Sequence, residues 1–200
     1  MQRAVPACAT LVHLTNSHAG EASLKIVAVS GSLRAASANT ALLRAAIALA
    51  PAGVQLVLYD EVGALPHFNP DDESAAPPAV RRWQDLLLGC DALLIACPEY
   101  AHGVPGAFKN ALDWVVGVVG LDGLPVALVN TAPRAVHAQA ALAEIVTTMG
   151  WSIVADASLQ IPVARKGVLL PEAGLDAEFA DPLRRAVHAL ATAARDYRKG

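Results

Sequence analysis

The sequence has little charge and no block of either sign. Its 200 residues include 15 Lys and Arg and 18 Asp and Glu, which gives a formal net charge of -3. A nucleic-acid-binding surface needs a basic run, and none stands out, so no nucleic-acid partner is expected. Hydrophobic residues make up 54% of the chain instead. This composition predicts a compact globule, and the length suits one α/β domain.

Cysteine is also scarce, and long apolar runs are missing. The three cysteines, Cys8, Cys90 and Cys97, form no CxxC pair and no metal-like spacing with histidine, so we expect no metal site. Their odd number and apolar surroundings indicate reduced, packed thiols in a cytoplasmic protein. The alternative, a redox-active thiol, lacks the cationic neighbours that would activate it. No stretch reaches the roughly 20 apolar residues that span a bilayer, so no membrane partner is expected.

The first 23 residues lack the pattern of an export signal. Their short apolar part is broken by Pro6 and His13, and they contain a single basic residue, Arg3. We interpret residues 1–23 as a flexible extension, or as the product of an upstream start codon, and assign residues 24–200 to one domain.

Strand-like and helix-like segments alternate five times along that domain. Short apolar runs predict strands over residues 25–30, 54–60, 92–98, 124–132 and 151–159. Helices are predicted over residues 39–49, 77–89, 106–116, 135–150 and from 176 toward 198. Because parallel neighbours need crossover helices, this alternation predicts one doubly wound parallel sheet. Such sheets bind ligands outside the carboxyl ends of their strands, so the loops after the first, third and fourth strands form the candidate site.

The loop after the first strand is rich in hydrogen-bond donors. It reads SGSLRAASANT and opens a helix, whose free N–H groups and positive dipole end favour an anion. Neither GxGxxG nor GxxxxGK[ST] occurs here, so the donors suit a terminal phosphomonoester rather than a dinucleotide or a P-loop ligand. Arg34 could add charge. The alternative is that Ser37 or Asn39 merely caps the helix in a solvated loop.

The loop after the third strand is an irregular, rigid turn. Two prolines and two glycines occur between Pro98 and Gly106, and Tyr100 adds an aromatic side chain. Such a turn presents backbone N–H and C=O groups to the edge of a planar ligand. The helix that follows carries an apolar stripe that predicts a core or a subunit interface: Phe108, Leu112, Val115 and Val116.

These two loops resemble those of a known family. The segments GSLRAASAN and PEYAHGVPGAFKNALDW are similar to motifs of the NADPH-dependent FMN reductases, flavodoxin-like proteins that include quinone, azo-dye and chromate reductases. The segment LPHFNPD resembles the family's loop after the second strand, and the similarity runs from Lys25 to about Arg195. The resemblance implies a flavodoxin-like five-stranded sheet of order 2-1-3-4-5, and an enzyme that commonly forms homodimers or homotetramers.

The resemblance also implies a bound FMN, which takes a hydride from NADPH or NADH and passes electrons to a quinone, a free flavin, an azo compound or a similar small molecule. It assigns the FMN phosphate to Ser32, Arg34, Ser37, Asn39 and Thr40. It assigns the isoalloxazine ring to Pro98, Glu99, Tyr100, Ala101, His102 and Gly103. We expect no catalytic side chain, because the flavin carries the redox step.

The loop after the fourth strand completes the predicted cofactor site with Thr131 and Arg134. Arg134 could receive the phosphate of NADPH, or it could be an ordinary surface arginine. We expect Glu99 to act through its backbone, because a carboxylate beside an anionic reduced flavin is unfavourable. His102 could donate to the flavin or lie exposed in solvent.

Two departures from the family pattern imply weaker flavin binding or an altered pocket. The family usually follows PEY with Asn, a small residue and Ser, whereas this chain has Ala101, His102 and Gly103. The loop after the fourth strand is glycine-rich in the family, whereas here it reads NTAPRAVHAQ. Two other functions therefore stay open. One is a non-enzymatic FMN electron carrier of the flavodoxin type, a class that is strongly acidic; the other is a family member with a regulatory role.

Overall fold

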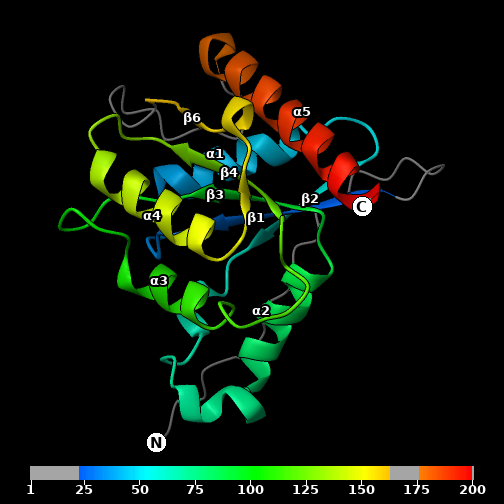
Figure 1. Cartoon of the computed structure of the whole chain (residues 1–200). Coiled ribbons are helices and arrows are strands. Elements are labelled where there is room, and N and C mark those ends of the chain that lie inside the picture. The colour runs from blue at the N-terminus through cyan, green and yellow to red at the C-terminus, as the bar shows by residue number, and fades with distance from the viewer. Residues whose placement is uncertain (1–22, 163–175, 200) are drawn as a thin grey trace, which may run out of the picture.

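The computed structural model describes residues 23–162 and 176–199 of the chain (Figure 1). Its strands are β1 (Leu24–Ser30), β2 (Val54–Tyr59), β3 (Ala92–Ala96), β4 (Pro125–Asn130), β5 (Ser152–Ile153) and β6 (Leu159–Gln160). Its helices are α1 (Ala38–Ala48), α2 (Pro78–Leu88), α3 (Gly106–Asp113), α4 (Val136–Thr148) and α5 (Ala177–Lys199). The extension predicted for residues 1–23, with Cys8, lies outside the described residues apart from Ser23.

A parallel sheet runs through the centre of the molecule in the order β2-β1-β3-β4-β5, and β6 pairs with β4 farther along (Figure 1). This order confirms the predicted topology. In register, Ser30 at the end of β1 lies opposite Ala96 at the end of β3. The Gly31 N–H donates to the Ala96 carbonyl at 2.9 Å. Because the two strands end level, the loops that follow them lie next to each other.

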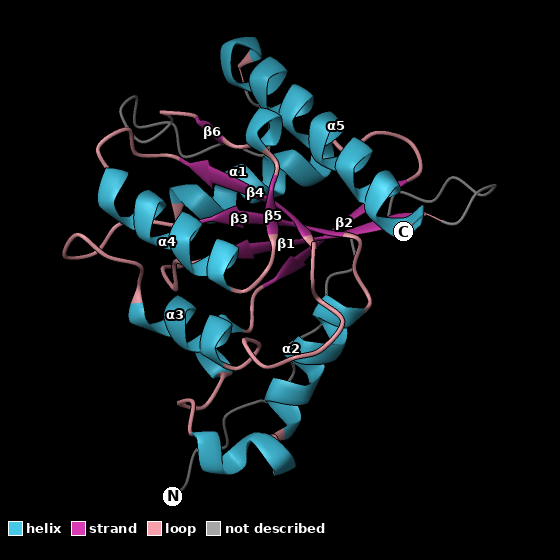
Figure 2. Cartoon of the chain, in the orientation of Figure 1, coloured by secondary structure: helices cyan, strands magenta, loops and turns pink. Residues whose placement is uncertain are grey.

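Helices cover both faces of the sheet (Figure 2). Helices α1 and α5 pack on the face that carries Ile26 and Leu94, whereas α2, α3 and α4 pack on the face that carries Val27 and Ile95. All five residues of β3 are buried, which explains the continuous apolar run in this part of the sequence.

The single strand predicted over residues 151–159 is wrong. Two strands of two residues each, β5 and β6, flank a 3-10 turn at Ala155–Ala157. At the break, the Ser158 hydroxyl accepts from Leu128 N at 3.0 Å and donates to the Val154 carbonyl at 2.9 Å. The serine side chain thus takes the place of a ladder acceptor. The segment lies at the edge of the sheet, and none of the other strands within residues 23–162 pairs with its outer side to keep it extended.

The helix predicted over residues 106–116 ends three residues early, at Asp113. Trp114 follows it, and its indole Nε1 donates to the Pro66 carbonyl at 2.8 Å, which ties the loop after β2 to the end of α3. Phe108, Leu112 and Val115 lie in the core as predicted; Val116 does not, because 55% of it is exposed.

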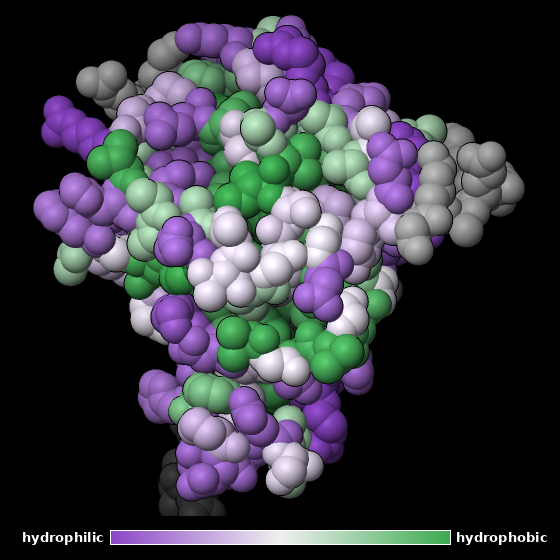
Figure 3. Space-filling model, viewed as in Figure 1, coloured by the Kyte–Doolittle hydropathy of each residue, from purple (hydrophilic) through white to green (hydrophobic). Residues whose placement is uncertain are grey.

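The face seen in Figure 1 is hydrophilic along α5, and hydrophobic residues gather in its centre below that helix (Figure 3). Within residues 23–162 and 176–199, no helix is both long and apolar enough to cross a membrane. In the same ranges, no three His, Cys, Asp or Glu side chains come together in a way that could hold a metal ion.

Candidate functional site

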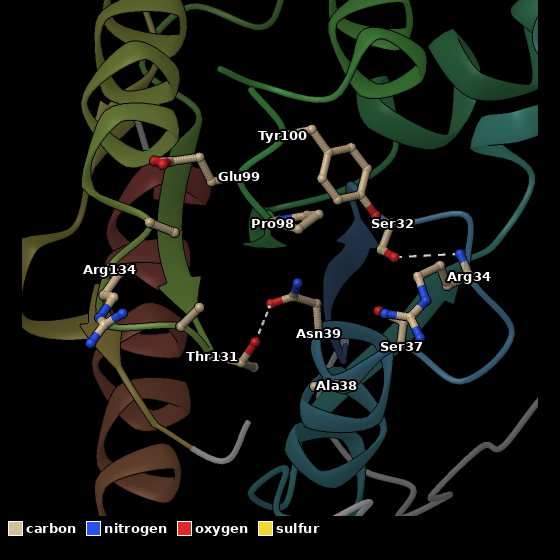
Figure 4. A pocket seen from close by; sticks show the side chains of 12 residues that line it. Ser32, Arg34, Ser37, Ala38, Asn39, Pro98, Glu99, Tyr100, Thr131 and Arg134 are labelled. Carbon is tan, nitrogen blue, oxygen red and sulfur yellow. Dashed lines mark hydrogen bonds between the residues drawn. The ribbon is translucent and has the colours of Figure 1, made fainter. Parts of the chain in front are cut away.

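A cavity of about 360 Å³ opens at the carboxyl ends of β1, β3 and β4. Its size is in the range of small-molecule sites. Three loops far apart in the sequence form its walls (Figure 4). The lining consists of Ser32, Arg34, Ser37, Ala38, Asn39, Pro98, Glu99, Tyr100, Thr131, Ala132, Arg134 and Ala135.

Nine of the thirteen predicted site residues line this cavity, and four do not. The four outside the lining are Thr40, Ala101, His102 and Gly103. Three further lining residues, Ala38, Ala132 and Ala135, are not predictable from the sequence, because alanine carries no functional group that marks it as part of a site.

Thr40 is not part of the cavity lining and supports the loop after β1 instead. Its hydroxyl donates to Ser30 Oγ at 3.0 Å, and the same Ser30 oxygen accepts from Ser32 N at 3.2 Å. Ser37 is the N-cap of α1, and its Oγ accepts from Thr40 N at 3.3 Å. Ser37 also lines the cavity, so this serine can cap α1 and face a ligand at the same time.

Asn39 is fixed by a residue from another loop. Its Oδ1 accepts from the Thr131 hydroxyl at 3.0 Å, and both side chains are buried (Figure 4). Because the oxygen is used in this bond, the amide nitrogen is the side turned toward Pro98 and the cavity. No other described residue accepts from that nitrogen. The pair therefore presents two oriented N–H donors to a ligand.

Two arginines give the cavity its positive charge. Arg34 lies on the loop after β1 and Arg134 on the loop after β4, on opposite sides of the cavity (Figure 4). Neither guanidinium forms a hydrogen bond or ion pair within the described part of the chain. Glu99 is the acidic residue of the lining. The cavity thus suits a ligand that carries more than one negative charge.

The carboxylate of Glu99 has a structural role that the sequence analysis did not give it. Its Oε2 accepts from Ala138 N at 2.8 Å, in the first turn of α4. The residue at the N-cap of α4, Ala135, has no side chain that could do this. Glu99 therefore caps the helix from the neighbouring loop, and its negative charge lies at the positive end of the helix dipole.

The loop after β3 closes in a tight turn of unusual backbone. Tyr100 and Gly103 exchange two backbone hydrogen bonds of 3.1 and 3.0 Å, and the two residues between them have φ angles of 49° for Ala101 and 59° for His102. Asn-Gly suits such a turn, whereas a left-handed conformation costs other residues roughly 1–2 kcal/mol each. The departure from Asn at position 101 thus strains the backbone as well as removing a side-chain amide.

His102 joins this turn to α4. Its ring stacks on the ring of His137, with centroids 4.3 Å apart and planes 21° from parallel. Together with the Glu99 cap, this stack connects the loops after β3 and β4, which form two walls of the cavity.

A second cavity of about 390 Å³ adjoins the first, and Arg34 and Tyr100 line both. Its other lining residues are small or apolar: Gly31, Leu33, Pro105, Gly106 and Ala107. Leu33 and Tyr100 are 59% and 49% exposed, so apolar surface lies open beside the polar cavity.

Cys90 and Cys97, the cysteines near the sheet, are free and buried. Burial raises the pKa of Cys97 to about 12, and burial raises that of Cys90 to about 12. Neither is a thiolate at neutral pH, so the structure gives no support to a redox-active thiol. Cys97 packs where β3 meets the loop after β1: a Cβ added to Gly31 would lie 3.0 Å from its Sγ. A side chain at position 31 would therefore require Cys97 to shift by a few tenths of an ångström.

Comparison with known proteins places these features in a family context. The model of the family described as NADPH-dependent FMN reductase matches residues 24–166. An NAD(P)H-dependent FMN reductase of Pseudomonas aeruginosa is 42% identical over 92 residues, which are 46% of this chain and 49% of the relative. A quinone reductase of Pseudomonas putida is 39% identical over 115 residues, 56% of this chain and 61% of the relative. The matched segment is thus about half to three-fifths of these relatives.

Among solved structures, the flavoenzyme NAD(P)H:(acceptor) oxidoreductase FerB from Paracoccus denitrificans is similar over most of its length. The TM-score is 0.69 at 27% sequence identity, and the match covers 87% of this chain and 98% of that one.

Proposed function

Because the chain belongs to the NADPH-dependent FMN reductase family, we propose that it binds FMN in the cavity and passes electrons from NADPH or NADH to a quinone-type small molecule. The membership confirms the resemblance read from the two loop motifs. The observation that carries the proposal is the composition of the cavity: oriented donors gather around the start of α1, and Pro98, Tyr100 and three alanines add nonpolar surface to the same cavity.

The donor-rich end fits a phosphomonoester. The hydroxyls of Ser32 and Ser37, the amide of Asn39 and the guanidinium of Arg34 lie around the start of α1. The free N–H groups of that helix start add further donors to the same region. Three phosphate oxygens need this many partners, and a neutral ligand would leave Arg34 without a counter-charge.

The nonpolar lining residues fit a planar ring. Pro98, Ala132 and Ala135 offer nonpolar surface, and Tyr100 offers an aromatic one. Bound FMN would supply hydride acceptance from a nicotinamide and electron delivery to an acceptor. The part of the chain is to hold the ring and exclude water from it. The contacts predicted for Ala101, His102 and Gly103 would lie outside the present cavity lining and stay a prediction.

The second cavity gives room for an apolar acceptor. It shares Tyr100 and Arg34 with the first, and its other side chains are those of Leu33, Pro105 and Ala107. A quinone ring is planar and mostly apolar, with oxygens that could accept from Arg34. The acceptor's ring and the cofactor would then contact the same tyrosine.

The two alternatives are less well supported. An electron carrier of the flavodoxin type would be strongly acidic, whereas this chain has a net charge of -3 and two arginines at the cavity. A regulatory role without flavin would leave the Asn39 amide and Arg34 without ligands. The cytoplasmic location and the homodimeric or homotetrameric state stay predictions; exposed Val116 and Val119 are compatible with a subunit interface.

Anaerobic stopped-flow absorbance tests the proposal. The full-length protein is saturated with FMN, mixed with NADPH or NADH, and then mixed with a benzoquinone. The expected result is bleaching of the flavin band by the nicotinamide and its return with the quinone. A protein that binds FMN but is not reduced by either nicotinamide is a carrier. A protein that shows no flavin band after incubation with FMN and removal of the free FMN by gel filtration is not a flavoenzyme.

A further inference from the structure

Hydrogen bonds fix the backbone of the loop after β4, which carries Arg134. The side chain of Asn130, which is buried, accepts from Ala132 N at 2.7 Å through its Oδ1 and donates to the Ala135 carbonyl at 3.3 Å through its Nδ2. Ala135 N also donates to the Ala132 carbonyl at 3.0 Å. These three bonds close a short turn around Pro133 and Arg134. The turn therefore fixes where the backbone of Arg134 lies, and the side chain lines the cavity from there.

Arg134 is a charge that the proposed FMN phosphate does not need. The phosphate donors gather around the start of α1, where Arg34 supplies the cation. Arg134 lies on the other side of the cavity (Figure 4). It is exposed, and none of the described residues neutralises it. A second anionic group, brought by a second ligand, would complete this side of the cavity.

We propose that Arg134 binds the 2′-phosphate of NADPH and makes the protein prefer NADPH to NADH. This inference rests on the proposed function, because it requires a nicotinamide donor at this cavity. The 2′-phosphate is a terminal dianion, which is the best match for the planar fork of a guanidinium. Dinucleotide sites use an arginine in the same way to accept the 2′-phosphate. The rim position suits a group at the far end of the donor from its reacting ring.

Arg134→Gln tests the inference, with Arg134→Lys and Arg44→Gln beside it. Arg44 is an exposed arginine of α1 outside both cavities, so it controls for the general loss of one positive charge. For each FMN-saturated variant, kcat/KM is measured with NADPH and NADH, and the Kd of NADP⁺ and NAD⁺ is measured by calorimetry. FMN affinity is measured by fluorescence titration.

Arg134→Gln should lower kcat/KM for NADPH and raise the Kd of NADP⁺ by about 10- to 100-fold, the range for a charge-assisted hydrogen bond. Values for NADH and NAD⁺ should stay within about twofold, and so should the Kd of FMN, because the interaction does not involve these ligands. Arg134→Lys should keep part of the preference, since it retains the charge but not the fork. Arg44→Gln should match the wild type.

Three results would overturn the inference. Equal losses for NADPH and NADH would assign Arg134 to the diphosphate that both share. Weakened FMN binding with an unchanged nicotinamide preference would assign it to the flavin phosphate. Unchanged kinetics and binding would make it an ordinary surface arginine. Failure of the proposed function is separate: in that case the wild type is reduced by neither nicotinamide, while NADP⁺ binding still reports on Arg134.

Discussion

At the scale of single residues, the Thr131 hydroxyl controls what a distant loop can offer a ligand. It donates to Asn39 Oδ1 at 3.0 Å across 92 positions of sequence. Thr131 is 3% exposed and Asn39 is 5% exposed, so water competes little for this bond. The bond selects one of the two orientations of the amide, and it is the one that directs N–H groups toward the cavity (Figure 4).

Thr131→Val should therefore weaken FMN binding, even though the Thr131 hydroxyl donates to Asn39 and not to the FMN phosphate. Without its donor, the amide loses its preferred orientation, which removes about 1 kcal/mol of positioning and raises the Kd of FMN roughly fivefold. Fluorescence titration of the apoprotein with FMN measures this. Thr131→Ser, which keeps the hydroxyl, is the matched control and should bind like the wild type. Equal affinities of the valine and serine variants would contradict the role given to this bond.

The sequence indicates which residue types form the candidate site, but it does not indicate the hydrogen-bond partners of those residues. The cluster of Ser32, Arg34 and Asn39 between a strand and a helix indicates an anion-binding loop, but composition alone fits a capped helix start in a solvated loop equally well. Nothing local indicates that Thr40 turns to Ser30, or that Asn39 pairs with a residue after β4. The left-handed turn at Ala101 was equally hidden, since alanine has no preference for that conformation.

At the scale of elements, a side-chain oxygen replaces a backbone acceptor at the break between β5 and β6. Leu128 lies in β4, a strand buried along its whole length, and its N–H finds no backbone acceptor where the neighbouring strand is interrupted. Ser158 Oγ supplies that acceptor and returns a hydrogen bond to Val154. The apolar composition of residues 151–159 indicates one strand, because sequence patterns report burial and not which atom completes a ladder.

Ser158→Ala should lower the free energy of unfolding by about 1–3 kcal/mol, because it leaves a buried N–H of β4 without an acceptor. Urea denaturation followed by circular dichroism measures the change. Ser152→Ala is the control: this serine lies in β5, is exposed and forms no side-chain hydrogen bond with another described residue, so its loss should change stability little. If both substitutions had the same small effect, the hydroxyl would not be completing the sheet.

At the scale of the whole molecule, the sheet order was predictable because alternating strands and helices leave few ways to build a parallel sheet. The contacts that join the two ends of the domain could not be predicted from the sequence. Asp91 accepts from Lys25 N at 2.7 Å, and its carboxylate accepts from Arg198 at 2.7 and 3.0 Å. One side chain thus joins the starts of β1 and β3 to the last turn of α5. Such contacts link residues across most of the chain, and no periodicity encodes them.

The buried titratable groups make the whole fold sensitive to alkali. Burial is the main cause that raises the pKa of Tyr59 to about 12, and the nearby Glu61 carboxylate raises it further. The Tyr59 hydroxyl has no hydrogen-bond partner among the described residues, and the nearby Arg82, whose charge lowers the pKa, offsets the effect of burial only in part. Burial also raises the pKa of Cys90 and of Cys97 to about 12. At a pH above the ordinary pKa values of 9.0 for cysteine and 10.0 for tyrosine, and below about 12, all three groups keep their protons in the folded protein, whereas an unfolded chain loses them.

The protein should therefore lose stability as the pH rises above 9. An unfolded cysteine or tyrosine loses its proton near pH 9.0 or 10.0, whereas the folded groups hold theirs to about 12. Between these values the folded state binds more protons, so each group lowers the free energy of unfolding by up to about 1.4 kcal/mol per pH unit. Thermal melts from pH 8 to 11 should show a melting temperature that falls progressively. Cys97→Ala should make that decline shallower, whatever its effect at pH 8, because one buried group no longer titrates. A melting temperature that stays level to pH 11, or an unchanged slope in the alanine variant, would show that burial does not protect these protons.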